Sequence, residues 1–273
     1  MDIALIMTTP DFAGLNIQKQ LLKFYPFKET GERFEQKPVY EAKTPLHMLR
    51  MYTTNTKCTH CDHFDKKIHA DVFVFPTTHR SAAGIHSFTV HPIGNWSSAD
   101  LGGEKKTLGI APARLMKHTF LLLKHFAQGL SYEVVMESTH HGPSLGKPCM
   151  FIEIGSNEES WKNEQAGAVI AQTLLKLFSD DIPQYKTACA FGGPHYAPNF
   201  IKILEQTDIA ISHICPKHHL ASLDAAMMQQ IKEKTVEPLD LALVDWKGLG
   251  EHKQKIITLL QEANIPVQKT KDI

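Results

Sequence analysis

The chain has 273 residues, of which 42% are hydrophobic and 21% charged, a composition that excludes a disordered or low-complexity protein and supplies a substantial core. Its 29 basic residues balance its 29 acidic residues, which argues against binding nucleic acid through bulk positive charge but leaves room for a local basic patch. The length predicts one domain over residues 1–273, with two intimate lobes as the alternative.

The compartment is predicted from the cysteines and from the hydrophobic pattern. The chain has five cysteines, an odd number, and Met1 leads into an apolar strand pattern without a basic segment or a small-residue cleavage site. No uncharged apolar run approaches the roughly 18 residues of a membrane span. We therefore expect a protein of the reducing cytoplasm that does not enter a membrane.

The first half of the chain predicts strands separated by one helix and two irregular stretches. Asp11 is a plausible N-cap for the helix, with Leu15, Leu21 and Leu22 on one side. Residues 26–46 are expected to form loop and short strands, and residues 76–104 a long irregular stretch, which in a compact domain is usually functional or mobile. Strands are predicted at residues 2–7, 47–53 and 71–75.

Strands and helices alternate regularly in the second half. Pro112 fits the first turn of a helix over residues 112–127, and Ser156 with Glu159 makes a capping box that opens another helix. Further strands are predicted at residues 108–111, 131–136, 150–154, 187–191, 208–212 and 239–244, and further helices at residues 220–232 and 251–263. This alternation predicts an α/β fold with a largely parallel sheet.

Polar side chains follow the ends of five predicted strands. They include His79, Glu137 with its neighbours His140 and His141, His195, Lys217 and Lys247, while Glu153 lies near the end of its own strand. In open α/β sheets, ligands bind beyond the carboxyl ends of the strands, so a parallel sheet would bring these groups together. For any single histidine, an ordinary polar surface loop explains the residue equally well.

The densest cluster is the segment from Glu137 to Pro143, with one carboxylate and two imidazoles within five residues. Zinc binds three or four such ligands, and a catalytic zinc leaves one position open. Adjacent imidazoles often diverge, so one of His140 and His141 can bind a metal while the other orients a ligand or takes a proton. The spacing differs from the HExxH motif of zinc peptidases.

Two other segments have competing interpretations. Asn95 and Trp96 suit hydrogen bonding and stacking with a nucleotide or amino-acid ring, but a tryptophan in the core with Asn95 in a turn explains them equally well. Cys58 and Cys61 lie close to two histidines, yet no second pair follows at the spacing of a structural zinc site, so we interpret them as incidental. Cys149 as a nucleophile lacks an acid partner.

Seven segments, taken in order, resemble the archaeal and plant type of D-aminoacyl-tRNA deacylase, over nearly the whole chain from Ile3 to beyond Lys247. One departure is Pro194, where the family pattern has a third glycine after Gly192 and Gly193. The segments are residues 78–81 (THRS), 90–96 (VHPIGNW), 137–143 (ESTHHGP), 151–156 (FIEIGS), 192–198 (GGPHYAP), 213–217 (HICPK) and 244–248 (VDWKG).

The resemblance implies a hydrolase that cleaves the ester between a D-amino acid and tRNA, and so keeps D-amino acids out of translation. It also implies a phosphorylase/hydrolase-like fold, which is a three-layer α/β sandwich with a largely parallel or mixed sheet, and two zinc ions per subunit. The expected partner is the acceptor end of aminoacylated tRNA, with no DNA and no membrane. The oligomeric state is open, and a monomer is compatible with the sequence.

The mechanism expected from this resemblance uses zinc to activate water and Glu153 to take the proton from that water. The expected catalytic residues are Glu153, His140 and His141. The expected metal ligands are drawn from His79, His91, Glu137, His140, His141 and His195, and the expected substrate contacts are Asn95, Trp96, Tyr196, Lys217 and Lys247. The alternatives are a zinc-dependent amidohydrolase or peptidase on a related fold, and a non-catalytic module that binds tRNA or a metabolite.

Overall fold

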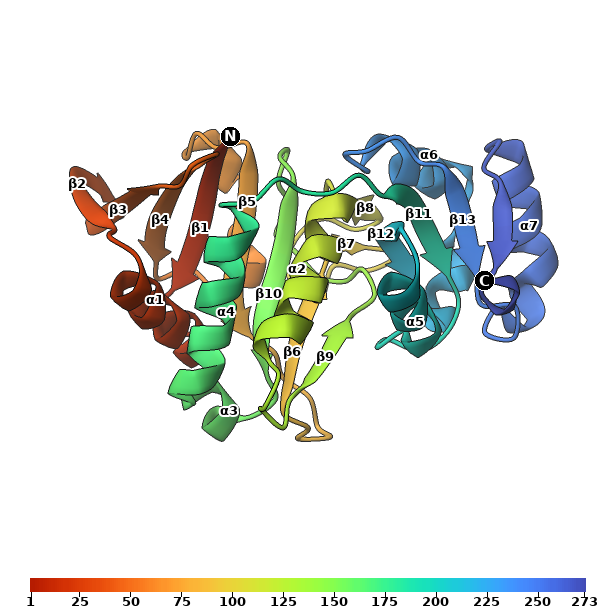
Figure 1. Cartoon of the computed structure of the whole chain (residues 1–273). Coiled ribbons are helices and arrows are strands. Elements are labelled where there is room, and N and C mark those ends of the chain that lie inside the picture. Colours follow the sequence, from red (N-terminus) through yellow and green to blue (C-terminus); the bar gives the residue numbers. More distant parts are fainter.

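A computed structural model describes residues 1–273 and shows two main β-sheets flanked by helices (Figure 1), together with a small two-stranded sheet. The larger sheet has eight strands in the order β2-β3-β4-β1-β5-β10-β6-β9, and the smaller sheet has four in the order β12-β11-β13-β14. The larger sheet is formed by β1 (Asp2–Thr8), β2 (Lys28–Phe34), β3 (Lys37–Lys43), β4 (Met48–Thr54), β5 (Val72–Thr78), β6 (Ser87–His91), β9 (Glu133–Met136) and β10 (Cys149–Gly155).

The larger sheet is mixed. Strands β4, β1, β5 and β10 are parallel to one another, whereas β6 runs antiparallel to β10 and pairs in parallel with β9. Strands β2 and β3 form an antiparallel arm next to β4. The α/β class with a largely parallel or mixed sheet is therefore confirmed.

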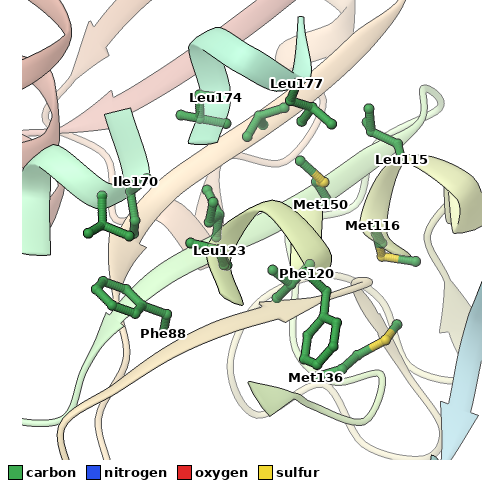
Figure 2. Packing of buried hydrophobic residues seen from close by; sticks show 14 of the residues in the cluster. Phe88, Leu115, Met116, Phe120, Leu123, Met136, Met150, Ile170, Leu174 and Leu177 are labelled. Carbon is green, nitrogen blue, oxygen red and sulfur yellow. The ribbon is translucent and has the colours of Figure 1, made fainter. Parts of the chain in front are cut away.

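Three helices cover one face of the larger sheet: α1 (Phe12–Phe24), α2 (Ala113–Phe126) and α4 (Glu164–Leu177) (Figure 1). Figure 2 shows Phe120 and Leu123 of α2 and Ile170 of α4 packed over Phe88 of β6 and Met150 of β10. Each fully buried side chain of this kind stabilises the fold by about 1.5–3 kcal/mol. These contacts fix the strands that carry the functional residues.

The opposite face of the larger sheet is covered by short segments. Phe73 and Phe75 of β5 and Phe151 of β10 pack there against residues of the 3-10 turns Cys58–His60 and Phe64–Lys66. The rings of Phe75 and Phe151 stack with centroids 4.8 Å apart. Because consecutive strand residues point to opposite faces, Glu153 points to the same face as Phe151.

The smaller sheet is parallel throughout and has helices on both faces. Helix α5 (Pro198–Gln206) packs on the face shared with α2, and α6 (Ala225–Glu233) and α7 (Lys253–Glu262) pack on the other. Its strands are β11 (Lys186–Phe191), β12 (Ile209–Cys215), β13 (Leu241–Val244) and β14 (Val267–Lys269). No helix of the chain is both long enough and apolar enough to cross a membrane.

Several local predictions are wrong in detail. The stretch 76–104 is not irregular throughout, because it contains the buried strand β6 and the short strand β7 (Gly94–Asn95), which pairs with β8 (Thr107–Leu108). Residues 26–46 form the two full strands β2 and β3. Strand β14 and helix α5 were not predicted; α5 lies in a stretch interrupted by Pro194 and Pro198, which obscured its pattern.

The helix caps agree only in part with their sequence signals. Asp11 does cap α1, accepting a hydrogen bond from Gly14 N at 2.7 Å, but α1 buries Ile17 and Leu21 and exposes Leu15. No capping box forms at Ser156, whose hydroxyl donates to a backbone carbonyl oxygen instead. The helix divides into α3 (Glu158–Lys162) and α4, because two asparagines, Asn157 and Asn163, cap the two parts separately.

Candidate metal centre and active site

The candidate site lies in a cleft of about 640 Å³ on the face of the larger sheet opposite the helices. His79 follows β5, Glu153 points from β10, and His91 is the last residue of β6. The segment after β9 supplies Glu137 and two histidines. The backbone N–H of Glu137 donates to Val90 O at 3.0 Å, which extends the hydrogen bonding between β9 and β6 by one residue. These side chains therefore meet on the face of the larger sheet that borders the smaller sheet. They do not line up along one carboxyl edge, contrary to the prediction, because β6 and β9 run antiparallel to β5 and β10.

Three histidines, His91, His140 and His141, form an imidazole triad. Their ring centroids are 4.1, 4.9 and 4.3 Å apart. Nδ1 of each ring lies 3.1, 2.8 and 2.6 Å, respectively, from a backbone carbonyl oxygen. A carbonyl only accepts, so Nδ1 of each carries a hydrogen, and in the neutral ring Nε2 keeps its lone pair. The three Nε2 atoms are therefore prepared to bind a cation.

The backbone that carries His140 and His141 packs closely against the loop that contains Gly102 and Gly103. A Cβ atom on Gly142 would lie 2.3 Å from Gly103 N and 2.5 Å from Thr59 O, so the chain can pass here only as glycine. His141 has a φ of 45°. This close contact fixes the direction in which both His140 and His141 enter the cleft.

Two glutamates and His79 form a second group, the carboxylate triad. Nδ1 of His79 lies 3.2 Å from Oε1 of Glu137 and 3.3 Å from Oε2 of Glu153. Glu137 is completely buried, and neither of its carboxylate oxygens has a hydrogen-bond partner. An unpaired buried carboxylate is costly, so its oxygens call for a cation.

Alternative groupings share residues between these triads. Glu137, His140 and His195 also bring one ligand atom each within 4.8 Å of one another. Since Nδ1 of His140 is committed to a carbonyl, its Nε2 can bind only one ion. The imidazole triad and the carboxylate triad are disjoint, and together they provide two independent sets of three ligand atoms.

The two glutamates titrate differently because their neighbours differ. Burial, together with the charge of Glu153, raises the pKa of Glu137 to about 7. Burial also opposes ionisation of Glu153, but the imidazoles of His79 and His91 next to it outweigh that effect and lower its pKa. Burial would lower the pKa of His79, yet the hydrogen bond to Glu153 and the charge of Glu137 raise it overall.

The histidines that face the cleft are held neutral. Burial, reinforced by the neighbouring imidazoles, lowers the pKa of His140. The same causes lower the pKa of His141 to about 3 and the pKa of His195 to about 4. Neutral imidazole is the form that binds metals. Nε2 of His91 is buried and has no hydrogen-bond partner. The unpartnered atoms and the nitrogen and oxygen donors together fit zinc.

The smaller sheet adds the wall of the cleft next to these triads. The loop after β11 carries His195, whose Nδ1 lies 2.9 Å from the hydroxyl of Ser138, and whose carbonyl accepts from Ser138 N at 2.9 Å. Tyr196 follows, with its hydroxyl 3.1 Å from Nε2 of His79. The two sheets therefore both contribute to one site.

Comparison with known proteins agrees with these features. The family profile described as D-aminoacyl-tRNA deacylase matches residues 66–268. The D-aminoacyl-tRNA deacylases of Pyrococcus furiosus and Thermococcus onnurineus are 37% and 36% identical to this chain, each alignment covering 95% of this chain and 97% of the relative. The Methanosarcina barkeri protein of that name is 35% identical over 99% of this chain and 90% of its own length.

The chain belongs to the D-aminoacyl-tRNA deacylase family. The expected resemblance and the expected enzyme class, a hydrolase, are thereby confirmed. A crystal structure described as a conserved protein of unknown function has the same fold, with a TM-score of 0.90 and 29% identity over 100% of this chain and 96% of its own.

The structure brings together all six residues that the sequence pointed to as metal ligands, and Tyr196 lies beside them. Two further contributors to the site had no role assigned to them from the sequence. Ser138 contacts His195, and Asp11 accepts hydrogen bonds from both threonines at the end of β5, next to His79. Asp11 and β5 are 66 residues apart, so only the fold shows this contact.

Four of the expected substrate contacts do not line this cleft, although Asn95 and Trp96 line a smaller cavity next to His140 and His141. Trp96 is 2% exposed and donates from Nε1 to Thr139 O at 3.0 Å, so its ring packs in the core and offers no free face for stacking. Asn95 is also buried and donates to two carbonyl oxygens of its own loop. Lys217 begins the 3-10 turn Lys217–Ser222, and Lys247 lines a different cleft on the smaller sheet.

The cysteines do not join the candidate metal groups. Cys58 lines the cleft wall, and burial raises the pKa of its thiol to about 11. Burial raises the pKa of Cys149 as well, so neither thiol is an activated nucleophile. All five cysteines are free and buried.

Proposed function

We propose that this chain hydrolyses the ester bond of D-aminoacyl-tRNA, for example D-tyrosyl-tRNA, and releases the free D-amino acid and tRNA. Family membership supports the substrate class. The observation that carries the chemistry is the imidazole triad, whose three ligand atoms lie within 4.8 Å of one another and of which His140 and His141 line an open cleft. Five free cysteines support a reducing cytoplasm as its location.

The residues present fit two zinc ions. His91, His140 and His141 would hold one ion, and the disjoint group of His79, Glu137 and Glu153 would supply donors for the other, with one of its two carboxylates left for proton transfer. When bound, zinc acts as a Lewis acid and lowers the pKa of water in its coordination shell toward about 7. The two zinc ions that the family resemblance implies thus match the number of separate donor sets.

Glu153 is the carboxylate suited to receive a proton from the attacking water. Its pKa is lowered by His79 and His91, so it is ionised, and its Oε2 already accepts from Thr89 at 2.9 Å. The donors around it fix its orientation. If Glu153 instead binds metal, Glu137 with its pKa of about 7 is the remaining carboxylate for this role.

The loop after β11 is suited to contact the substrate. Tyr196 is 37% exposed in the cleft wall, and His195 presents a neutral imidazole beside it. A neutral imidazole and a phenol both donate hydrogen bonds without attracting bulk anions. We assign them to positioning the ester against Glu153.

The decisive experiment compares the hydrolysis of D-tyrosyl-tRNA with that of L-tyrosyl-tRNA, with chelator present and after zinc is restored. We expect hydrolysis of the D-ester alone, its loss on chelation and its recovery with zinc. Equal slow decay of both esters would contradict the proposed function. In that case, peptides and N-acyl amino acids would test the amidohydrolase or peptidase alternative.

A matched pair of variants tests the imidazole triad in the same assay. His141→Ala removes one of the three Nε2 donors and should reduce turnover at least about 100-fold, together with the bound zinc. His125→Ala removes an exposed histidine of α2 and should have no effect. Activity of His141→Ala within a few-fold of the parent would exclude this residue from the chemistry.

A further inference from the structure

A second cleft, of about 610 Å³, lies on the smaller sheet and takes no part in the metal centre. Its walls come from α5, the loop after β13 and the last residues of the chain. The residues used below are Asn199, Lys202, Asp245, Trp246, Lys247 and Lys271.

The position of this cleft is the one at which α/β sheets bind ligands. The chain leaves β11 toward β12 on one side, and later adds β13 and β14 on the other side of β11. The order of strands thus reverses between β11 and β13, and the crevice beyond their carboxyl ends is the usual ligand site. The loops that follow both strands are packed tightly here, since a Cβ atom on Gly248 would lie 2.3 Å from Gly193 N.

Positive charge is concentrated at this cleft, although the whole chain has a formal net charge of zero. Lys202, Lys247 and Lys271 line it, and all three are exposed. Two further ammonium groups lie over the ring of Trp246, Lys269 at 4.4 Å and Lys253 at 5.5 Å from its centroid. A local potential of this kind attracts polyanions even when the net charge is zero.

The side-chain carboxylate that lines the cleft is already committed to the protein. Asp245 is 8% exposed, and its side chain accepts from Asn199 Nδ2 at 3.1 Å and from Gly248 N at 3.2 Å. Its charge therefore organises the two loops, and the exposed lysines are left to face a ligand. Lysines spread over three separate chain segments suit an extended row of phosphates better than one small anion.

The second cleft also lies close to the metal centre. Tyr196 lines the first cleft and Asn199 lines the second, and three residues span at most about 11 Å. The lysines are therefore within reach of a chain of nucleotides whose end lies at the metal centre.

We propose that the cleft around Trp246 binds the sugar–phosphate backbone of the tRNA through Lys202, Lys247 and Lys271, while the ester lies at the metal centre. This inference rests on the proposed function for the identity of the RNA. It assigns phosphate binding to the smaller sheet, separately from the residues that act on the ester.

The test measures binding and hydrolysis separately. The first probe is fluorescently labelled, unacylated tRNA, whose anisotropy gives Kd at several salt concentrations. The second is the D-tyrosyl ester of adenosine, which has no phosphate. The variant Lys202→Glu/Lys247→Glu is compared with Lys186→Glu, an exposed lysine at the opposite end of β11, and with the neutral Lys202→Gln/Lys247→Gln.

We expect Lys202→Glu/Lys247→Glu to raise Kd for tRNA about ten-fold or more, and to reduce the slope of log Kd against log salt by about 1.5. The glutamine variant should have a smaller effect in the same direction. Hydrolysis of the adenosine ester should change less than two-fold, and Lys186→Glu should bind tRNA like the parent protein.

Unchanged tRNA affinity in the double glutamate variant would overturn the inference, as would an equal loss in Lys186→Glu or a parallel loss of adenosine-ester hydrolysis. The two proposals fail in different ways. A parent protein that binds tRNA through these lysines but cleaves no D-ester contradicts only the proposed function. A parent protein that cleaves the D-ester but whose variants bind tRNA normally contradicts only this inference.

Discussion

The hydroxyl of Tyr196 lies 3.1 Å from Nε2 of His79, although the two residues are 117 positions apart in the chain. The other ring nitrogen of His79 lies within 3.3 Å of both Glu137 and Glu153. The tyrosine therefore fixes the orientation of an imidazole that contacts the two carboxylates of the site. A residue of the smaller sheet thus positions a residue of the larger one.

Tyr196→Phe tests this positioning. The variant loses one hydrogen bond, worth about 0.5–1.5 kcal/mol, so kcat for the D-ester should fall about three- to ten-fold with a smaller change in KM. Tyr25→Phe, which removes a hydroxyl bonded to Lys43 O far from the site, should leave kcat unchanged. An unaltered kcat in Tyr196→Phe would show that His79 needs no such support.

Glu137→Gln should have opposite effects on stability with and without zinc. In the metal-free protein the buried carboxylate accepts no hydrogen bond and has only nearby imidazoles to offset its charge, so a neutral amide there should raise Tm by about 2–4 °C. With zinc present, the parent should be the more stable, because the ion binds only the folded protein with this donor. Calorimetry with chelator and with zinc measures both differences.

Glu133→Gln provides the control, since this exposed residue begins the same strand, β9. It should behave like the parent in both conditions. A Tm of the parent protein that does not respond to chelation or zinc would refute the role given to Glu137.

Asp11→Ala should destabilise the protein more than the loss of a simple helix cap. Asp11 accepts from Gly14 N at 2.7 Å, and also from Thr78 N at 3.0 Å and from the hydroxyl groups of Thr77 and Thr78. The free energy of unfolding should fall by about 3 kcal/mol, with reduced activity because Thr78 precedes His79. Urea denaturation measures the change.

The matched variant is Asp224→Ala, which removes the cap of α6, where the side chain accepts from Met227 N at 2.9 Å. Its expected cost is about 1 kcal/mol, with activity retained. Equal costs for the two variants would mean that the contacts of Asp11 with β5 add nothing to stability.

Lys117 makes stability depend on pH in the alkaline range. Its ammonium group is buried in α2 and donates to the carbonyl oxygens of Thr207 and Ile209, and burial lowers its pKa to about 8. The unfolded chain, with an ordinary lysine pKa of about 10.4, binds the proton more tightly. Stability contributed by this residue should therefore rise as the pH increases from about 8 to about 10.

The measurement is the free energy of unfolding of the parent minus that of Lys117→Met, followed from pH 7.5 to pH 10. This difference should increase with pH. Lys124→Met, an exposed lysine two turns further along the same helix, controls for the loss of a charge and should give a constant difference. A constant difference for Lys117→Met would show that its environment does not disfavour the charged form.

The local sequence pattern predicted much of the site because most of its residues follow a strand directly. His79, Glu137 and His195 each come after an apolar run, and such runs form strands whatever their partners are. Such runs do not indicate which strands pair or in which direction. Strand β6 enters the larger sheet antiparallel to β10, and only that pairing brings His91 next to Phe151 and thus near Glu153.

Burial was the other feature that the sequence left undecided. Asn95 and Trp96 suited a binding role and a structural role equally, and the structure shows both side chains engaged with backbone carbonyl oxygens. Which residues are covered depends on segments far away in the chain, in this case Thr139 for Trp96. The same reason explains why the contact of Asp11 with Thr77 had no local signal.

The order of the site residues along the chain separates two tasks. Every residue of the imidazole and carboxylate triads precedes residue 156, whereas His195, Tyr196 and the lysines of the second cleft all follow residue 186. The part of the chain before residue 156 therefore holds both triads, and the part after residue 186 forms surfaces that the incoming molecule meets. Substitutions in the second cleft can therefore alter which RNA is accepted without touching either triad.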